Sequence, residues 1–275
     1  MSAEPGRGEH PARAEENRRI WDANARWWDD RIGDGNEFQT LLIEPATEQL
    51  LAEVAGDLVL DIACGAGRFA RRLADLGARV VAFDGSERFI ERARQRTPEG
   101  TSVEFRVLDA CDGSALQSLG EGRFDKAVCT MGLMDMPELL PLYSALPTLL
   151  KPNGTFVLSV THPCFNTVGT HRFAETYEED GRQRIRSGVR IASYLTPAAA
   201  KTEGVLGQPE PQFSFHRPLH LLLGPLFARG FVMDGIEEPA LPPGEAVTAG
   251  VRWSDMPEIP PVLVVRLRLQ GPVAA

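Results

Sequence analysis

Blocks of apolar and polar residues alternate along the middle of the chain and predict a regular succession of strands and helices. Nearly continuous apolar runs predict strands at residues 58–63, 79–83, 103–108, 124–130 and 155–160. Apolar residues recur at helical spacing between these runs, which predicts helices at residues 68–76, 87–96, 113–119 and 138–150. Buried strands that are separated by helices indicate an α/β fold with a parallel sheet covered on both faces.

The N-terminal part carries a different pattern. Residues 1–15 are polar and contain Pro and Gly, so we expect them to be disordered. Residues 16–56 predict two helices, and Trp21, Ala25 and Trp28 fall on one face of the first. This helical segment precedes the first strand of the sheet.

The last third of the chain departs from the strand–helix alternation. Residues 162–216 show no sustained periodicity, and we expect them to form an insertion over the carboxyl edge of the sheet. A helix at residues 219–229 is followed by strands at residues 231–237 and 262–269. Because no helix joins these two strands, we expect them to be antiparallel. The predicted core therefore comprises residues 57–161 and 217–270.

Composition and charge narrow the class of protein. The 275 residues are 43% hydrophobic and 24% charged, as in ordinary globular proteins. A formal net charge of -9 argues against a nucleic-acid binder, which needs a basic surface. The sequence contains neither an apolar run long enough for a membrane span nor a secretory signal, and its four cysteines form no C-x-x-C pair. We therefore expect a cytoplasmic protein without a zinc site, which binds neither nucleic acid nor membrane; no oligomeric state is favoured.

The stretch LVLDIACGAGRFA contains a glycine turn between the first strand and the next helix. Gly65, Gly67 and Ala70 match the G-x-G-x-x-G/A pattern of dinucleotide sites, which leaves a dehydrogenase as one alternative. Asp61, however, precedes the turn, and its carboxylate would repel a pyrophosphate. A ligand with a cationic amine and a sulfonium would be favoured there instead. The two glycines allow positive φ angles and a close approach of the backbone to the ligand.

Two further carboxylates end the neighbouring strands. Ligands of open α/β sheets bind outside the carboxyl ends of the strands, where Asp84 and Asp109 lie. Asp84 can accept hydrogen bonds from ribose hydroxyls, and Asp109 can accept one from an adenine amine. Each carboxylate taken alone could equally cap a turn or face solvent. Together with Asp61 they describe a ligand with adenine, ribose, ammonium and sulfonium groups, which is S-adenosylmethionine.

The segments VLDIACGAGRFA, VVAFDGS, VLDACD and FDKAVCTMGLMDM resemble the class I S-adenosylmethionine-dependent methyltransferases, of the small-molecule type, over about residues 58–160. The resemblance implies a Rossmann-like sheet of seven strands in the order 3-2-1-4-5-7-6, with strand 7 antiparallel. It also implies S-adenosyl-L-methionine as cofactor, S-adenosyl-L-homocysteine as product, and a passage of the chain after the fourth strand close to the cofactor. The expected cofactor-binding residues are Asp61, Ala63, Gly65, Gly67, Asp84, Gly85, Ser86, Asp109, Ala110, Met131, Leu133 and Trp28.

The flanking segments WDANARWWDDRIGDGNEFQ, SVTHPCF and FSFHRPL resemble a narrower group of small-molecule methyltransferases. In that group the N-terminal helices form a lid over the methionine end of the cofactor and the acceptor. The resemblance makes Trp27, Trp28, Asn36 and Phe38 the lid candidates. The alternative is that the tryptophans only pack on the edge of the sheet.

Methyl transfer to a hydroxyl or a protonated amine is helped by a general base, and histidine suits neutral pH. His162 follows the fifth strand directly and is the first candidate; His216, at the end of the insertion, is the second. The alternative for His162 is that it orders the loop before Pro163. Cys164 is a weaker candidate for a nucleophile, because no second cysteine follows the fourth strand and the chain lacks a basic surface.

The acceptor is constrained only coarsely. The loop MGLMDM lacks the D/N-P-P-Y/F signature of methyltransferases that act on nucleic-acid amines or glutamine. Arg182, Arg184, Arg186 and Arg190 would share one face of a strand, either to meet an anionic acceptor or as a solvated edge. We therefore predict methyl transfer to O, N or C of a small molecule of secondary metabolism. A protein of the same fold that binds the cofactor and catalyses another reaction, such as a cyclisation, is the alternative.

Overall fold

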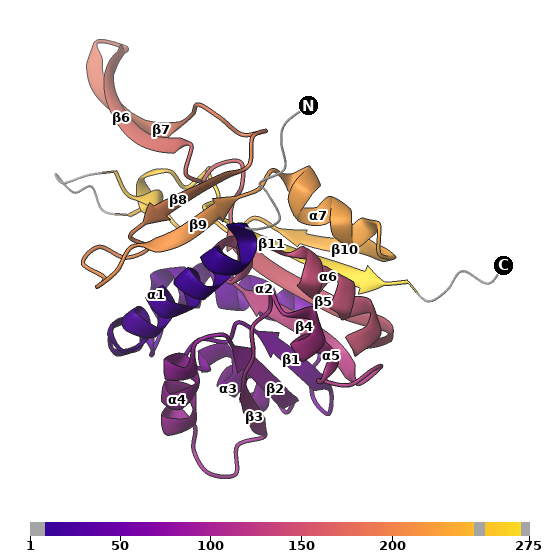
Figure 1. The fold of residues 1–275 in the computed structure, drawn as a ribbon. Coiled ribbons are helices and arrows are strands. Elements are labelled where there is room, and N and C mark those ends of the chain that lie inside the picture. Colours follow the sequence, from indigo (N-terminus) through magenta and orange to yellow (C-terminus); the bar gives the residue numbers. More distant parts are fainter. Residues whose placement is uncertain (1–8, 245–250, 271–275) are drawn as a thin grey trace.

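The computed structural model describes residues 9–244 and 251–270 and is built around one twisted sheet of seven strands (Figure 1). The strand order is β10-β11-β5-β4-β1-β2-β3, and β11 runs antiparallel to both of its neighbours. The strands are β1 (Leu58–Ile62), β2 (Arg79–Asp84), β3 (Val103–Val107), β4 (Phe124–Thr130), β5 (Leu150–Thr161), β10 (Phe231–Glu237) and β11 (Val262–Leu269). Both the predicted order and the antiparallel last strand are confirmed.

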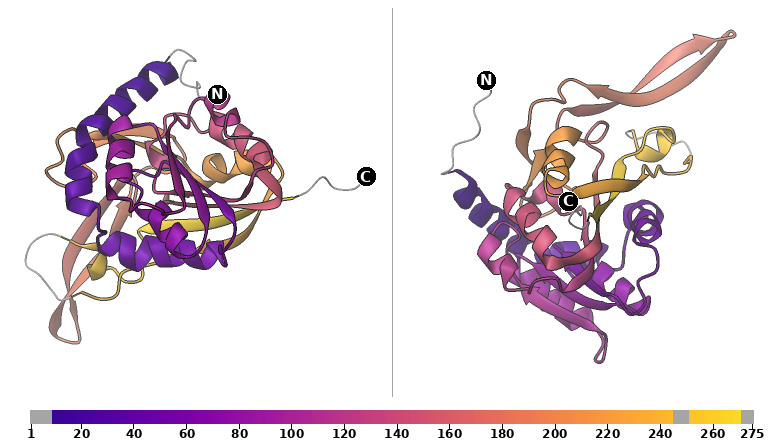
Figure 2. Two further views of the ribbon diagram at one scale, coloured as in Figure 1. Left: turned by 90° about the horizontal axis from the view of Figure 1, so that it is seen from below. Right: turned by 90° about the vertical axis from the view of Figure 1, so that its right-hand side faces the viewer.

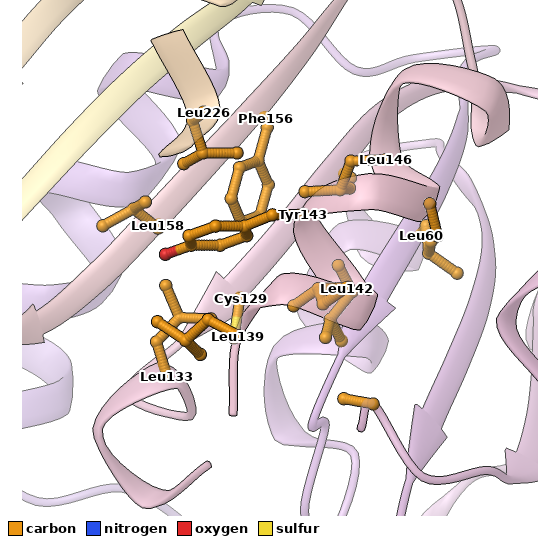
Figure 3. Close-up of a cluster of buried hydrophobic side chains, with 14 of the residues drawn as sticks. Leu60, Cys129, Leu133, Leu139, Leu142, Tyr143, Leu146, Phe156, Leu158 and Leu226 are labelled. Atoms are coloured by element: carbon orange, nitrogen blue, oxygen red, sulfur yellow. The ribbon is translucent and has the colours of Figure 1, made fainter. Parts of the chain in front are cut away.

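Apolar residues on both faces of the sheet are covered by helices. One face packs against α5 (Gly113–Gln117), α6 (Leu140–Leu149) and α7 (Leu219–Phe227), and the other against α2 (Glu44–Leu51), α3 (Arg68–Asp75) and α4 (Glu87–Arg96). Figure 3 shows the first of these clusters around Tyr143, which is fully buried. Its hydroxyl donates a hydrogen bond to the carbonyl oxygen of Leu222 at 3.1 Å, so a buried polar atom ties α6 to α7.

The N-terminal segment forms one long helix, α1 (Glu9–Ile32), followed by a π-helical turn, η1 (Phe38–Ile43), that leads into α2. The disorder expected for residues 1–15 therefore does not extend to residues 9–15, and residues 1–8 lie outside the described part. Buried Asp29 of α1 forms ion pairs with Arg92 and Arg96 of α4. These contacts fix the helix beside the sheet. Among the described residues, no helix combines the length and the apolar content that a membrane crossing requires.

The insertion consists of two antiparallel hairpins, which the sequence pattern did not reveal. The first, β6 (Thr170–Glu179) with β7 (Arg182–Ile191), forms an arm that projects from the body of the molecule (Figures 1 and 2). Its turn residues Asp180 and Gly181 both have positive φ angles, and Asp-Gly is a typical two-residue hairpin turn. That dipeptide was the available sequence signal for the arm.

The second hairpin pairs β8 (Ala198–Thr202) with β9 (Gln212–His216), and the loop between them packs on α1. The side-chain amide of Asn24 donates to the carbonyl oxygen of Glu210 at 2.7 Å and accepts from its backbone N–H at 2.9 Å. Because Asn24 is fully buried, this reciprocal pair holds α1 against the insertion.

The arginine row lies on one face of β7, as the alternation predicted, but it faces residues of the arm itself. Arg184 forms an ion pair with Glu179 at 2.8 Å, and the Arg186 guanidinium lies over the Tyr177 ring at 4.5 Å. Arg190 stacks in the same way on a phenylalanine of β6. The row therefore belongs to the solvated edge of the arm, which was one of the two alternatives.

Candidate functional site

A cavity of about 270 Å³ opens at the carboxyl ends of β1 to β4, beneath α1. Its wall combines the turn after β1, the ends of the next three strands and one side of α1. The structure brings nine of the predicted cofactor residues to this wall: Ala63, Gly65, Asp84, Gly85, Ser86, Asp109, Ala110, Met131 and Trp28.

The turn after β1 has the unusual backbone that its glycines permit. Ala63, Gly65 and Gly67 all have positive φ angles. Gly67 does not line the cavity; a Cβ atom there would lie 2.7 Å from the Phe105 ring and 3.0 Å from Cβ of Ala93. Its glycine is therefore required for the packing of the turn against β3 and α4.

Asp84 is held in place by two backbone donors. Its Oδ2 accepts from the N–H of Gly65 at 2.9 Å, and its Oδ1 accepts from the N–H of Ser86 at 2.8 Å. Desolvation raises the pKa of Asp84 to about 6, although these two hydrogen bonds favour the ionised form. Each carboxylate oxygen retains a further acceptor site toward the cavity.

Asp61 occupies an unexpected environment. It is fully buried in the middle of the sheet, where it pairs with Ala82 and Val128 of the neighbouring strands, and it does not line the cavity. Within the described part of the chain, neither carboxylate oxygen has a hydrogen-bond partner. Burial, reinforced by the charge of Asp84, raises the pKa of Asp61 to about 8. Asp61 therefore lies in the interior of the sheet and not at the mouth of the turn, where the sequence analysis expected it.

Helix α1 covers the cavity and contacts the loops that line it. The Ser86 hydroxyl donates to Oδ1 of Asp22 at 2.6 Å, and the Arg18 guanidinium lies 3.8 Å from Oδ2 of Asp109. Asp109 also accepts from the backbone N–H of Cys111 at 2.8 Å. These contacts join α1 to the ends of both β2 and β3.

The four lid candidates behave differently. Trp28 lines the cavity, and its indole N–H is buried without a partner among the described residues. Trp27 instead stacks under Arg31, at 5.3 Å from the guanidinium. The side chain of Asn36 accepts from a backbone N–H of η1, and Phe38 packs on the core. Of the four candidates, Trp27, Asn36 and Phe38 do not line the cavity.

Neither predicted catalytic histidine lines the cavity, and both have their ring nitrogens engaged elsewhere. In His162, Nδ1 accepts from the backbone N–H of Cys164 at 3.1 Å and Nε2 lies 2.8 Å from Oε1 of Glu238. Desolvation lowers the pKa of His162, although Glu238 opposes this shift. In His216, Nδ1 lies 2.7 Å from the Thr167 hydroxyl and Nε2 lies 2.7 Å from a backbone carbonyl. The geometry favours the alternative in which His162 orders the loop.

The loop after β4 contains two residues that the sequence predicted for the site and one, Asp135, that it did not. Met131 lines the cavity with a positive φ angle, whereas Leu133 is fully buried in the core cluster of Figure 3. Asp135, at the end of the 3-10 turn η2 (Leu133–Asp135), lines the cavity as well. Desolvation holds the pKa of Asp135 well above its usual range. An acidic residue in the loop after β4 was the signal that could have identified it.

Comparisons with known proteins agree with the predicted family. A family model described as a methyltransferase domain matches residues 59–154. A ubiquinone biosynthesis O-methyltransferase of Xanthomonas euvesicatoria pv. vesicatoria is 34% identical over 138 residues, which cover 49% of this chain and 55% of that protein. The chain therefore spans about half the length of the curated relatives it matches.

Solved structures extend the likeness beyond the matched domain. An S-adenosylmethionine dependent methyltransferase from Mesorhizobium loti has a TM-score of 0.63 at 26% identity, over 86% of this chain and 99% of that one. The 1,6-didemethyltoxoflavin-N1-methyltransferase of Burkholderia thailandensis has a TM-score of 0.56 at 18% identity, over 98% of this chain and 94% of that one. The second likeness concerns the fold alone.

Proposed function

Because the chain belongs to the class I S-adenosylmethionine-dependent methyltransferase superfamily, we propose that it transfers the methyl group of S-adenosylmethionine to O, N or C of a small molecule. The observation that carries this proposal is the arrangement of carboxylates around the β1 turn. Asp84 and Asp109 end adjacent strands at the cavity, and Asp61 lies buried without a partner behind it. An adenosine that carries an ammonium group matches this set of acceptors and negative charge.

The described residues fit the cofactor at each end. The two oxygens of Asp84, already oriented by Gly65 and Ser86, can accept from the ribose hydroxyls. Asp109 can accept from the adenine amine, next to the backbone of Ala110. The carboxyl of Asp61 has no partner among the described residues, and the ammonium group of the methionine end would provide an oppositely charged one.

When bound, the cofactor supplies an electrophilic methyl group on a sulfonium, so the protein mainly aligns the reactants and excludes water. Trp28 and Trp21 of α1 form an apolar cover of the cavity, with the two indole rings 5.6 Å apart. Met131 is fixed by a hydrogen bond from its N–H to the carbonyl oxygen of Ser159 at 2.9 Å, which positions the backbone after β4 at the cavity. These residues orient the site and keep it dry.

Two observations support a small molecule as the methyl acceptor. The curated relatives are named for ubiquinone biosynthesis, whereas the flanking motifs led to the prediction of secondary metabolism. Both concern small molecules, and both are compatible with a covered cavity.

Calorimetric titration with S-adenosylhomocysteine and with NADH tests the proposed cofactor. We expect micromolar affinity for S-adenosylhomocysteine and none for NADH. Binding of NADH alone would refute the proposal and favour the dehydrogenase. Incubation with methyl-labelled cofactor and a metabolite extract then tests transfer itself, because a bound cofactor without any labelled product would favour a non-methylating reaction.

A further inference from the structure

Several charged side chains of the cavity wall are paired with protein partners, but at one place the described residues leave oxygen acceptors free. Asp135 lines the cavity, and its carboxylate makes no hydrogen bond or ion pair within the described residues. Asn17 of α1, only 8% exposed, donates from Nδ2 to the backbone carbonyl oxygen of Asp135 at 2.7 Å. The Asn17 Oδ1 atom has no partner in the described part of the chain. A carboxylate and an amide oxygen thus lie unused at the contact between α1 and η2.

The two arginines among the described residues of the wall each face a carboxylate. Arg68 forms an ion pair with Glu44 at 2.6 Å, and Asp29 is paired with two arginines of α4. Arg18 faces Asp109. Among the described residues of the wall, no arginine or lysine is left to receive an anion. An anionic acceptor would therefore bring its charge toward Asp135 uncompensated, whereas a hydrogen-bond donor would satisfy the free carboxylate and the free amide oxygen.

The sheet topology separates this place from the proposed adenosine site. β2 and β3 lie on one side of β1, and β4 lies on the other. Asp84 and Asp109 are at the ends of β2 and β3, so the adenosine occupies that side. Asp135 follows β4, on the opposite side of the switch point, where a second reactant has access to the same cavity.

On the basis of the proposed function, we propose that Asp135 and Asn17 bind the methyl acceptor through a hydroxyl or amine hydrogen, and that Asp135 takes its proton. The acceptor is then a neutral hydroxyl or amine compound rather than one that presents a carboxylate or phosphate to this site. A lone pair of the acceptor oxygen or nitrogen forms the new bond to the methyl carbon. The carbon–sulfur bond breaks with its electron pair moving to sulfur, and the acceptor proton passes to the Asp135 carboxylate.

Two observations support this role of Asp135. The histidines are engaged outside the cavity, whereas the Asp135 carboxylate lines it without a hydrogen-bond or ion-pair partner among the described residues. Asn17, whose Nδ2 donates to the backbone of Asp135, also provides a second unpartnered acceptor at the same turn, so one donor group can be held by both side chains.

The test measures which probe binds to the protein saturated with S-adenosylhomocysteine. Catechol is a neutral probe with hydroxyl donors, and benzoate is an anion of similar size. Calorimetric titrations compare the wild type with Asp135→Asn and Asn17→Ala, and with Asp75→Asn as a control at an exposed aspartate of α3. Affinity for S-adenosylhomocysteine is measured first in every variant.

We expect the wild type and the control to prefer catechol by about tenfold or more. At a pH high enough to ionise Asp135 in the wild type, Asp135→Asn should reduce this preference by about fivefold or more, because the repulsion of benzoate disappears. Asn17→Ala should weaken catechol binding by about threefold. An unchanged preference in Asp135→Asn, an unchanged catechol affinity in Asn17→Ala, or a wild type that binds no catechol would overturn the inference. Failure of the wild type to bind S-adenosylhomocysteine would instead refute the proposed function.

Discussion

The buried carboxyl of Asp61 makes a quantitative prediction about stability and pH. Its pKa is about 8 in the folded protein and 3.8 as the ordinary value, which we take for the unfolded chain. Between these values the folded state holds a proton that the unfolded state has released. The free energy of unfolding therefore falls as the pH rises, by about 1.4 kcal/mol per pH unit. Asparagine has nearly the same shape as the protonated side chain and does not ionise, so Asp61→Asn removes this dependence.

The difference between variant and wild type isolates this group from every other titration. From pH 5 to pH 7 we expect the variant to gain about 2–3 kcal/mol of unfolding free energy relative to the wild type. Urea unfolding at several pH values measures it, since both proteins share all other groups. Saturation with S-adenosylhomocysteine should reduce the difference, because under the proposed function its ammonium group stabilises the ionised carboxylate of Asp61.

A difference that stays within about 0.5 kcal/mol over this pH range would refute the reasoning, because it would mean that Asp61 ionises normally in the fold. If the difference depends on pH but S-adenosylhomocysteine leaves it unchanged, the raised pKa of Asp61 would stand. Its proposed interaction with the ammonium group of the cofactor would then be refuted.

Three further predictions concern single residues. Asp84→Ala should weaken S-adenosylhomocysteine binding by about 1–3 kcal/mol in calorimetry, because buried hydroxyls lose their acceptor; unchanged affinity would contradict the ribose role. Gly67→Ala should cost about 2 kcal/mol or more in thermal unfolding, because of the positive φ angle and the contact with Phe105; an unaltered melting temperature would show that the turn adapts. His162→Ala should lower the free energy of unfolding by about 1–3 kcal/mol and leave S-adenosylhomocysteine affinity intact, because its bonds to Glu238 and the loop are lost. A hundredfold loss of methyl transfer, about the scale of a removed general base, with unchanged stability would restore His162 as the base.

The strands and the sheet order were predictable because their signals are local. The apolar runs of β1 to β5 and the helix-free connection before β11 can be read from neighbouring residues alone. The strand-end rule then located Asp84 and Asp109, whose side chains do reach the cavity. Asp135 lies in η2, beyond the end of β4, so the strand-end rule alone does not locate it.

Other features depended on contacts between distant parts of the chain. His162 is engaged by Glu238, 76 residues away, and Asn24 holds a loop 186 residues away. No periodicity encodes such partners, because they are set by how finished elements pack. The sequence by itself therefore determined the sheet, the glycine turn and the presence of acidic strand ends. Tertiary structure decided that Asp61 lies buried in the sheet interior rather than at the cavity. It also decided that the histidines bind residues outside the cavity and that Asp135 and Asn17 line it together. The reason is that burial and pairing of a polar side chain depend on every element packed around it.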